Sequence, residues 1–330
     1  MTEARRKLFT WALMAGSAGI VIAACLIGPA GLSVSDALKA LFADTSAGVI
    51  VRDIRLPRAL AAWAAGAALG ASGAAMQGLL RNPLADPGVL GVSAMAALGA
   101  VIAIYFNLSS SAYWVTPIAA ILFAALATAF LYVSGAGRLS PSRLILVGVG
   151  MSSFSGALIA LVMNMAPNPF ILSDLVNWLF GAVANRSFDD LALAAPFMAA
   201  GLIAALIAAP GLTALSLGEE TAASLGVDLQ RTRALAISGA ALMTGASVAL
   251  AGAIGFVGIV APHLARPFVG HDPGRAILPS ALIGGAILSL ADLVIRLLPF
   301  DQELKLGVAA ALIGAPGFIW IAARTERIAR

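Results

Sequence analysis

Long apolar runs recur along the whole chain and decide the solvent in which it folds. A representative run extends from Ala59 to Leu80 and is apolar on all sides when drawn as a helix. About 20 such residues cross the hydrocarbon core of a bilayer as a helix, whose backbone satisfies its own hydrogen bonds. A membrane barrel would instead show strands of roughly ten residues with alternating polarity. The runs therefore predict an all-α, polytopic membrane protein.

Ten membrane-spanning helices can be drawn in the sequence. Hydrophobic residues make up 61% of the chain and charged residues only 11%, far from the composition of a soluble domain. The eighth segment is short, and Gly252, Gly255 and Gly258 leave its boundary with the seventh open. No linker or low-complexity tract divides the chain, so residues 1–330 are predicted to form a single transmembrane domain. The predicted spans are 8–28, 58–80, 89–106, 113–134, 143–166, 191–210, 232–252, 254–269, 276–298 and 305–323.

The distribution of basic residues predicts the orientation of these spans. With both termini in the cytoplasm, 13 of the 20 Lys and Arg residues fall on the cytoplasmic side, as the positive-inside rule requires. The net charge of +4 is thus explained by topology, and no nucleic-acid partner is expected. Residues 1–28 resemble a signal peptide, but their apolar stretch runs for about 20 residues and is interpreted as an uncleaved first span. We therefore expect a multi-pass protein of the inner membrane.

One outer loop, residues 29–57, departs from this charge rule. Lys39, Arg52 and Arg55 lie in it, and Arg58 follows immediately. The loop is long enough to hold structure of its own, and its basic excess requires a reason beyond topology. In the span that follows, Gly66 and Gly70 are four residues apart, a spacing that lets neighbouring helices approach closely.

Sites for energy conversion are scarce in the sequence. Asp292 and Arg296 lie four apart near the outer end of the ninth span and can pair on one helix face. None of the three lysines is followed by Ser or Thr, so the chain holds no P-loop and ATP hydrolysis is not expected on it. His263 and His271 lack the clustered ligands of a metal site, and Cys25 has no partner for a disulfide. The sequence predicts a protein that is no enzyme, with no cofactor or metal of its own.

Several connecting segments carry recognisable local signals. Asp86 and Pro87 are typical of a helix start, because a capping carboxylate precedes a proline in the first turn. Glu219 and Glu220 suit the positive end of a short helix, and Gly226 suits its C-terminal cap. The segments are Arg55-Leu-Pro-Arg58, Gln77-Gly-Leu-Leu-Arg-Asn-Pro-Leu-Ala-Asp-Pro-Gly-Val-Leu-Gly91, Leu215-Ser-Leu-Gly-Glu-Glu-Thr-Ala-Ala-Ser-Leu-Gly-Val227, Gly252-Ala-Ile-Gly-Phe-Val-Gly-Ile-Val-Ala-Pro-His-Leu-Ala-Arg266 and Leu312-Ile-Gly-Ala-Pro316.

Together, and in this order, these segments resemble the FecCD-type permeases, the membrane subunits of importers for ferric siderophores, haem and cobalamin. The resemblance extends from Arg52 to Ile321. It implies ten helices per subunit, a permease dimer, two cytoplasmic ATPase subunits that hold ATP and Mg, and a periplasmic substrate-binding protein. Transport would proceed by alternating access, with the fifth and tenth spans lining the pathway. A secondary carrier or a passive channel is the alternative, although few ionisable groups are available for ion coupling.

The resemblance also implies roles for individual residues. Arg55, Arg58 and Arg296 match positions that present arginines to acidic side chains of the binding protein, whereas interfacial snorkelling is the ordinary alternative. Residues 216–228 match the cytoplasmic coupling helices that contact the ATPase, and a solvated acidic turn is the alternative there. The coupling residues are Leu217, Gly218, Glu219, Glu220, Ala222, Leu225 and Gly226, and the cytoplasmic signature loop holds Arg81, Asn82, Pro83, Asp86 and Pro87.

Overall fold

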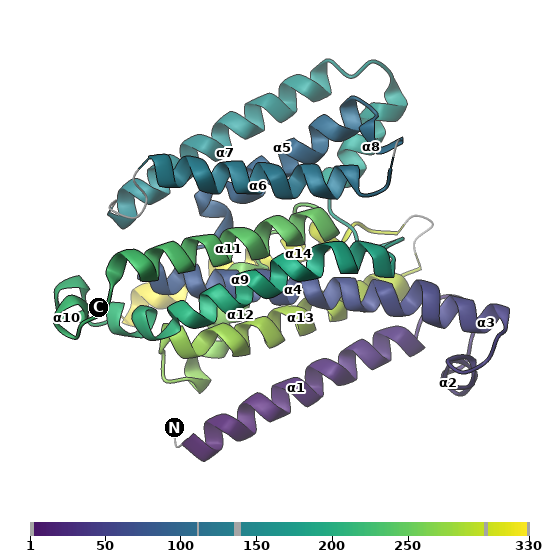
Figure 1. The fold of residues 1–330 in the computed structure, drawn as a ribbon. Coiled ribbons are helices and arrows are strands. Elements are labelled where there is room, and N and C mark those ends of the chain that lie inside the picture. Colours follow the sequence, from purple (N-terminus) through teal and green to yellow (C-terminus); the bar gives the residue numbers. More distant parts are fainter. Residues whose placement is uncertain (1–2, 111, 135–139, 300–302, 329–330) are drawn as a thin grey trace.

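The computed structural model describes residues 3–110, 112–134, 140–299 and 303–328, and every regular element in them is a helix. These helices form an elongated bundle (Figure 1), which confirms the predicted fold class. Arg138 and Arg330, which count toward the predicted cytoplasmic charge, lie outside the described residues. The long helices are α1 (Glu3–Leu26), α4 (Leu56–Leu79), α5 (Val92–Tyr105), α6 (Val115–Val133), α7 (Pro141–Asn164), α9 (Phe188–Leu215), α11 (Leu229–Ala251), α13 (Pro273–Leu297) and α14 (Leu306–Ile328).

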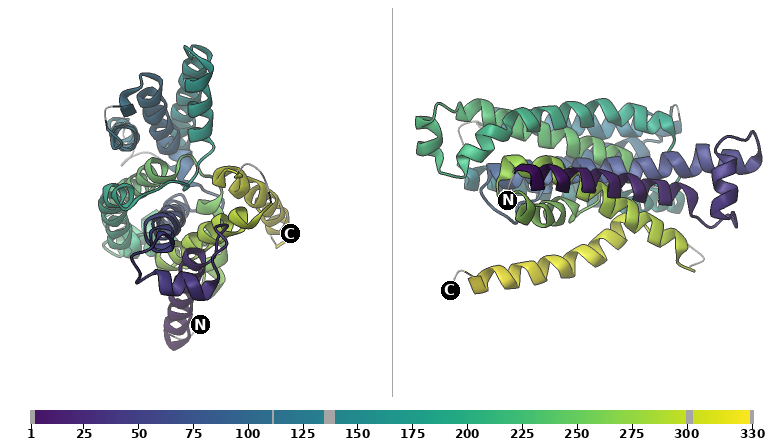
Figure 2. Two further views of the ribbon diagram at one scale, coloured as in Figure 1. Left: turned by 90° about the vertical axis from the view of Figure 1, so that its right-hand side faces the viewer. Right: turned by 90° about the horizontal axis from the view of Figure 1, so that it is seen from below.

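Short helices mark the two ends of the bundle. The chain termini lie at the same end as α10 (Glu219–Ser224), and we call this the α10 end (Figure 1). At the opposite end, the α2 end, α2 (Val34–Ala40), α3 (Ser46–Val49) and the π-helical turn η1 (Ile50–Arg55) fold the segment that precedes α4. The predicted structure in loop 29–57 is therefore confirmed. Figure 2 shows α14 leaning away from the other helices toward the C-terminus.

Side-chain caps fix where several helices begin. Ser187 and Asp190 form a capping box at α9, in which the Ser187 hydroxyl accepts from the Asp190 N–H and the Asp190 carboxylate accepts from the Ser187 N–H. The Asp228 carboxylate caps α11 by accepting from the Arg231 N–H, and the Asp272 carboxylate caps α13 by accepting from the Arg275 N–H. Asp272 also accepts a hydrogen bond from Thr213 of α9 at 2.6 Å, which joins two helices at the α10 end.

The centre of the bundle is the contact between α4 and α13, the most extensive between any two described elements. Glycine makes this approach possible. A Cβ atom on Gly66 would overlap the carbonyl of Gly284, and one on Gly70 would overlap the carbonyl of Ser280. The prediction that Gly66 and Gly70 permit close helix packing is confirmed, because both face the backbone of α13 directly.

Seven helices among the described residues are long and apolar enough to cross a membrane, and two more apolar helices, α5 and residues Leu306–Gly317 of α14, are shorter. Nine of the ten predicted spans thus correspond to these helices. The eighth, 254–269, does not form one continuous span. Its helix, α12 (Val257–Ala265), has nine residues and is followed by a 3-10 turn, η4 (Arg266–Phe268). At 1.5 Å per residue, α12 covers only about 14 Å of a core about 30 Å thick.

The break before α12 has a physical cause in Gly252. This residue has φ +77, and a Cβ on it would meet the carbonyl of Trp178 at 2.7 Å. Trp178 belongs to α8 (Pro169–Leu179), a helix that lies between the predicted spans 143–166 and 191–210. The N–H of Ala182, just after α8, donates to the carbonyl of Ala251 at 2.8 Å. Non-helical backbone at membrane depth is tolerated where protein covers it, and the segment after α8 supplies that cover.

Candidate functional site

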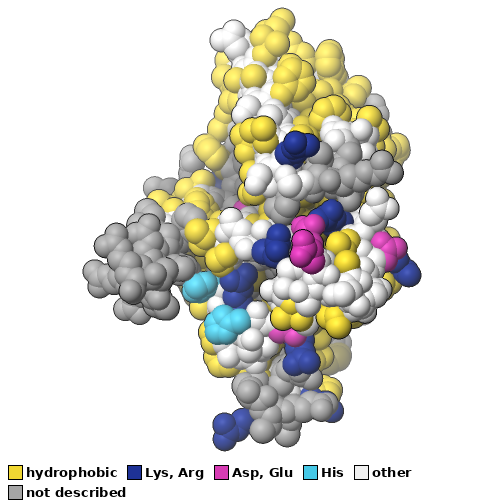
Figure 3. All heavy atoms as spheres, turned by 90° about the vertical axis from the view of Figure 1, so that its left-hand side faces the viewer, with side chains coloured by type: hydrophobic (Ala, Val, Ile, Leu, Met, Phe, Trp, Pro, Cys, Tyr) yellow, Lys and Arg dark blue, Asp and Glu magenta, His cyan; other side chains and the backbone are white. Residues whose placement is uncertain are grey.

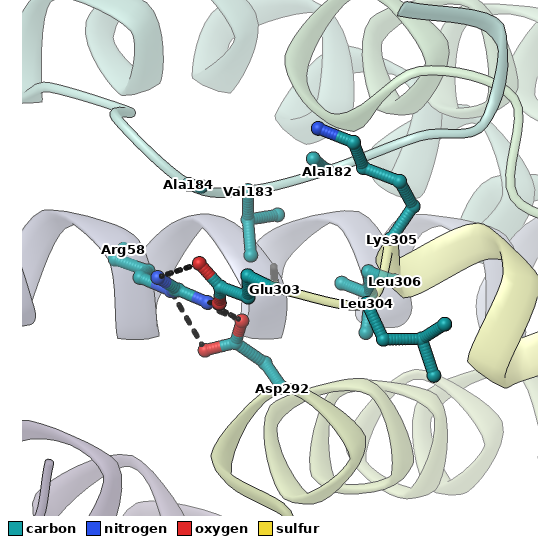
Figure 4. A pocket seen from close by; sticks show the side chains of 9 residues that line it. All are labelled: Arg58, Ala182, Val183, Ala184, Asp292, Glu303, Leu304, Lys305 and Leu306. Atoms are coloured by element: carbon teal, nitrogen blue, oxygen red, sulfur yellow. Dashed lines mark hydrogen bonds and ion pairs between the residues drawn. The ribbon is translucent and has the colours of Figure 1, made fainter. Parts of the chain in front are cut away.

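The α2 end holds a cluster of charged side chains centred on the buried carboxylate of Asp292 (Figure 4). Arg58, in the first turn of α4, donates from Nε and Nη2 to Asp292 at distances of 2.8–3.2 Å. Arg296 lies one turn after Asp292 on α13, and its Nε is 3.1 Å from Asp292 Oδ2. The predicted Asp292–Arg296 pair is confirmed. The structure adds that the same carboxylate also binds Arg58.

A second carboxylate completes the coordination of Arg58. Glu303, just before α14, accepts from Arg58 Nη1 at 3.2 Å and from Nη2. No local pattern in the sequence indicates this contact, although Glu303 and Arg58 are both placed on the outer side when the spans are counted. The Arg296 side chain is only 4% exposed, and its contact with Asp292 is an ion pair without hydrogen-bond geometry. Neither its Nε nor its Nη2 has a hydrogen-bond partner among the residues that the structure describes.

Arg55 is placed differently from Arg58 and Arg296. Its guanidinium is buried and donates to the carbonyl oxygens of Leu26 at 2.9 Å and Gly28 at 3.2 Å. These contacts join the end of α1 to η1, and a buried guanidinium stays favourable only when it is hydrogen-bonded in this manner. Docking by the three arginines stays a prediction. In this structure, Arg55 and Arg296 are turned into the protein, and Arg58 is 13% exposed.

The predicted coupling segment forms a single short helix, α10, at the other end of the bundle. Ala222 is fully buried, whereas Leu217 and Leu225 are 63% and 64% exposed. Gly226 has φ +81 and caps the helix, and the N–H of Val227 bonds to the carbonyl of Ala222. Both predicted cap signals are confirmed, but the rest of segment 216–228 is turn, and the next helix begins only at Leu229.

Glu219 connects α10 to its neighbours. Its Oε1 lies 2.7 Å from Arg233 Nη2 on α11 and 3.7 Å from Arg81 Nη2 in the loop after α4. Gly218 precedes it with φ +102, while Glu220 is exposed and directed to solvent. The two glutamates therefore differ, because Glu219 holds α10 against the bundle and Glu220 is exposed to solvent.

The predicted signature loop packs between several helices. The Asn82 side chain accepts from the N–H of Leu84 at 2.9 Å, and the Asp86 side chain accepts from the N–H of Gly88 at 2.7 Å. Asp86 and Pro87 open the 3-10 helix η2 (Pro87–Leu90), and α5 follows at Val92. The loss of hydration around Asp86 raises the pKa of its carboxyl, while the Gly88 N–H lowers it by less.

Helix η2 is held closely by the helices around it. A Cβ on Gly148 of α7 would overlap the carbonyl of Val89, and a Cβ on Gly258 of α12 would lie 2.5 Å from the Pro87 ring. Pro83 is half-buried and Arg81 is exposed at φ 49. The loop thus connects the surface beside α10 to α7 and α12 inside the bundle.

The α10 end differs from the rest of the surface in composition. Figure 3 shows that charged side chains and histidines gather on part of this face, while hydrophobic side chains cover the region toward α5–α7. No group of three or more His, Cys, Asp or Glu side chains that could hold a metal ion occurs in residues 3–110, 112–134, 140–299 and 303–328.

Comparisons with known proteins agree with this arrangement. The chain is 42% identical over 280 residues to the vitamin B12 import system permease protein BtuC of Vibrio cholerae, covering 84% of this chain and 83% of the relative. It is 36% identical over 317 residues to the probable siderophore transport system permease protein YfiZ of Bacillus subtilis, covering 93% of both.

A solved structure has the same fold. It is assigned to the metal-chelate type of ABC transporter and has an inward-facing conformation. The TM-score is 0.84 at 30% sequence identity, over 96% of this chain and 99% of the solved one. The FecCD transport family matches residues 16–324. On this match and on the relatives, the chain belongs to the FecCD transport family.

Proposed function

We propose that this chain is the membrane-spanning subunit of an ATP-driven importer that carries a bulky metal chelate across the inner membrane. Two copies form the pathway, and α7 and α14 line it. Two cytoplasmic ATPase subunits bind ATP and Mg at the α10 end and drive transport by hydrolysis, and a periplasmic binding protein delivers the cargo at the α2 end. Both chain termini lie on the cytoplasmic side. Family membership and the two relatives that carry vitamin B12 and siderophores support this proposal.

The observation that carries the proposal is the geometry of α10. A helix that docks in a groove of a partner presents apolar side chains to that groove. Leu217 and Leu225 are exposed, and Ala222 and Glu219 fix the helix to the bundle. A solvated acidic turn would give no reason for two exposed leucines beside a buried alanine. We therefore assign residues 216–228 to ATPase coupling.

An ion-coupled carrier or a passive channel is the competing function. Coupling ions are bound by ionisable side chains near mid-membrane. In the described helices that are long enough to cross a membrane, ionisable residues lie toward the helix ends, and the most buried of them, Asp292, is already paired with Arg58 and Arg296. This distribution favours an importer driven by a separate ATPase.

The order of cargoes to test follows from the family and the relatives. The resemblance to the family puts ferric siderophore first, haem second and cobalamin third. The 42% identity with a vitamin B12 permease moves cobalamin ahead of haem. The test is reconstitution in liposomes with each cargo, with and without the ATPase and the binding protein. Uptake that needs both partners and ATP supports the proposal. Uptake by this chain alone would overturn it.

A further inference from the structure

Carboxylates of its own chain accept from four of the five N–H donors of the Arg58 guanidinium. Asp292 takes Nε and one side of Nη2, and Glu303 takes Nη1 and the other side of Nη2 (Figure 4). A guanidinium offers five N–H donors in a planar fork, and two carboxylates use that fork from two directions. A docking partner that presents an acidic side chain therefore meets an arginine that is already paired.

The two carboxylates are not equivalent. The Asp292 side chain is 2% exposed and also pairs with Arg296, so its removal would leave two arginines without a buried counter-charge. The Glu303 side chain is 40% exposed, and Arg58 is its one ion-pair partner among the described residues. Lys305, two residues on, directs its ammonium away from Glu303 (Figure 4). Asp292 thus fixes Arg58 in place, while Glu303 occupies its accessible side and is open to exchange.

Beside this contact is a small cavity lined by Arg58, Asp292, Glu303, Lys305 and residues 182–184. Its volume of about 20 Å³ is enough for about one water molecule. The room for the Glu303 carboxylate to move comes from the 40% exposure of its side chain and not from this cavity.

We propose that Glu303 is an internal competitor for docking, which occupies Arg58 until a carboxylate of the binding protein replaces it. This inference rests on the proposed function, since it assumes docking at the α2 end. The exchange replaces one partly exposed ion pair by another. A partner therefore gains little binding free energy from it unless its carboxylate fits Arg58 better than Glu303 does. Glu303 thereby reduces docking by acidic surfaces that fit poorly.

The opposite role for Glu303 makes the opposite prediction. If Glu303 instead orients Arg58 for the partner, its removal would weaken docking. If Glu303 competes, removal of its charge frees Arg58 and strengthens docking by about two- to fivefold, the range for a partly exposed ion pair. The sign of the change therefore separates the two roles.

The experiment measures binding of the ligand-free substrate-binding protein of the same transport system to this permease in nanodiscs. Glu303→Gln and Glu303→Ala are compared with Asp44→Asn, a matched control. Asp44 also lies at the α2 end, is 99% exposed and pairs with Arg52 at 3.1 Å, outside the arginines assigned to docking. All three variants remove one negative charge, so the control measures the general electrostatic effect on association.

Tighter binding for both Glu303 variants than for Asp44→Asn supports the inference. Affinities equal to the control overturn it, and so do affinities below that of the unmodified chain. Both of these outcomes leave the proposed function intact, because docking itself is then observed. An unmodified permease that does not bind the protein at all overturns the proposed function together with the inference.

Discussion

Replacement of Asp292 by Asn removes the buried charge on which two arginines converge. Arg58 approaches this carboxylate to 2.8 Å and Arg296 to 3.1 Å, and Asp292 is 1% exposed. Loss of one partner from a buried ion pair costs about 3–5 kcal/mol, because the remaining charge is left without compensation. Glu303 still neutralises Arg58 in the variant, so we expect the lower part of that range, about 3 kcal/mol.

The assay is reversible unfolding of the purified protein in mixed micelles, read as a free energy of unfolding. Asp44→Asn is the control, since its pair with Arg52 is exposed and such pairs contribute about 0–1 kcal/mol. A loss for Asp292→Asn no larger than that of Asp44→Asn would refute the assignment of Asp292 as the buried centre of the cluster.

A triple variant tests whether the loss comes from stranded charges. Arg58→Met, Asp292→Leu and Arg296→Met together remove the buried charges and keep similar side-chain volume. Apolar replacement of a whole buried ionic cluster is often neutral or stabilising. We therefore expect the triple variant to recover most of the stability that Asp292→Asn loses, and stability equal to or lower than that of the single variant would contradict the reasoning.

Three further predictions concern other parts of the bundle. Gly73→Ala places a Cβ onto the backbone of α12 and should lower the free energy of unfolding by about 1–3 kcal/mol. Gly16→Ala is the control, because no atom lies within 4 Å of the new Cβ, and it should not destabilise the protein. Burial raises the pKa of the Asp86 carboxyl, so above that pKa the charged carboxylate destabilises the folded state. Asp86→Asn should therefore raise the melting temperature at pH 7.5. The gain should shrink as the pH falls toward about 4, where a carboxyl becomes protonated, and scanning fluorimetry can follow it. Leu225→Ala should weaken binding of the ATPase subunit about tenfold in a pull-down titration without changing thermal stability, and Leu38→Ala, an exposed leucine at the α2 end, should leave ATPase binding unchanged.

Much of the fold follows from local sequence patterns. Apolar runs such as Ala59–Leu80 are long enough to require helices, since a bilayer offers the backbone no other hydrogen-bond partners. The caps at Asp86 and Gly226 were also predictable, because a helix cap depends only on residues within one turn of it. Two glycines four apart, Gly66 and Gly70, were enough to predict a close helix contact, although not which helix would fill it.

Contacts between distant residues depend on the tertiary structure. Arg58 and Asp292 are 234 positions apart, and only the rotation and depth of α4 against α13 bring them together. The same packing turns Arg55 inward to the end of α1 and places Glu303 on Arg58, and neither contact leaves a periodic signal in the sequence. The sequence determined that helices form and where arginines gather along the chain, because these are local properties. The tertiary structure decided which charges are buried and paired, because pairing depends on how whole helices pack.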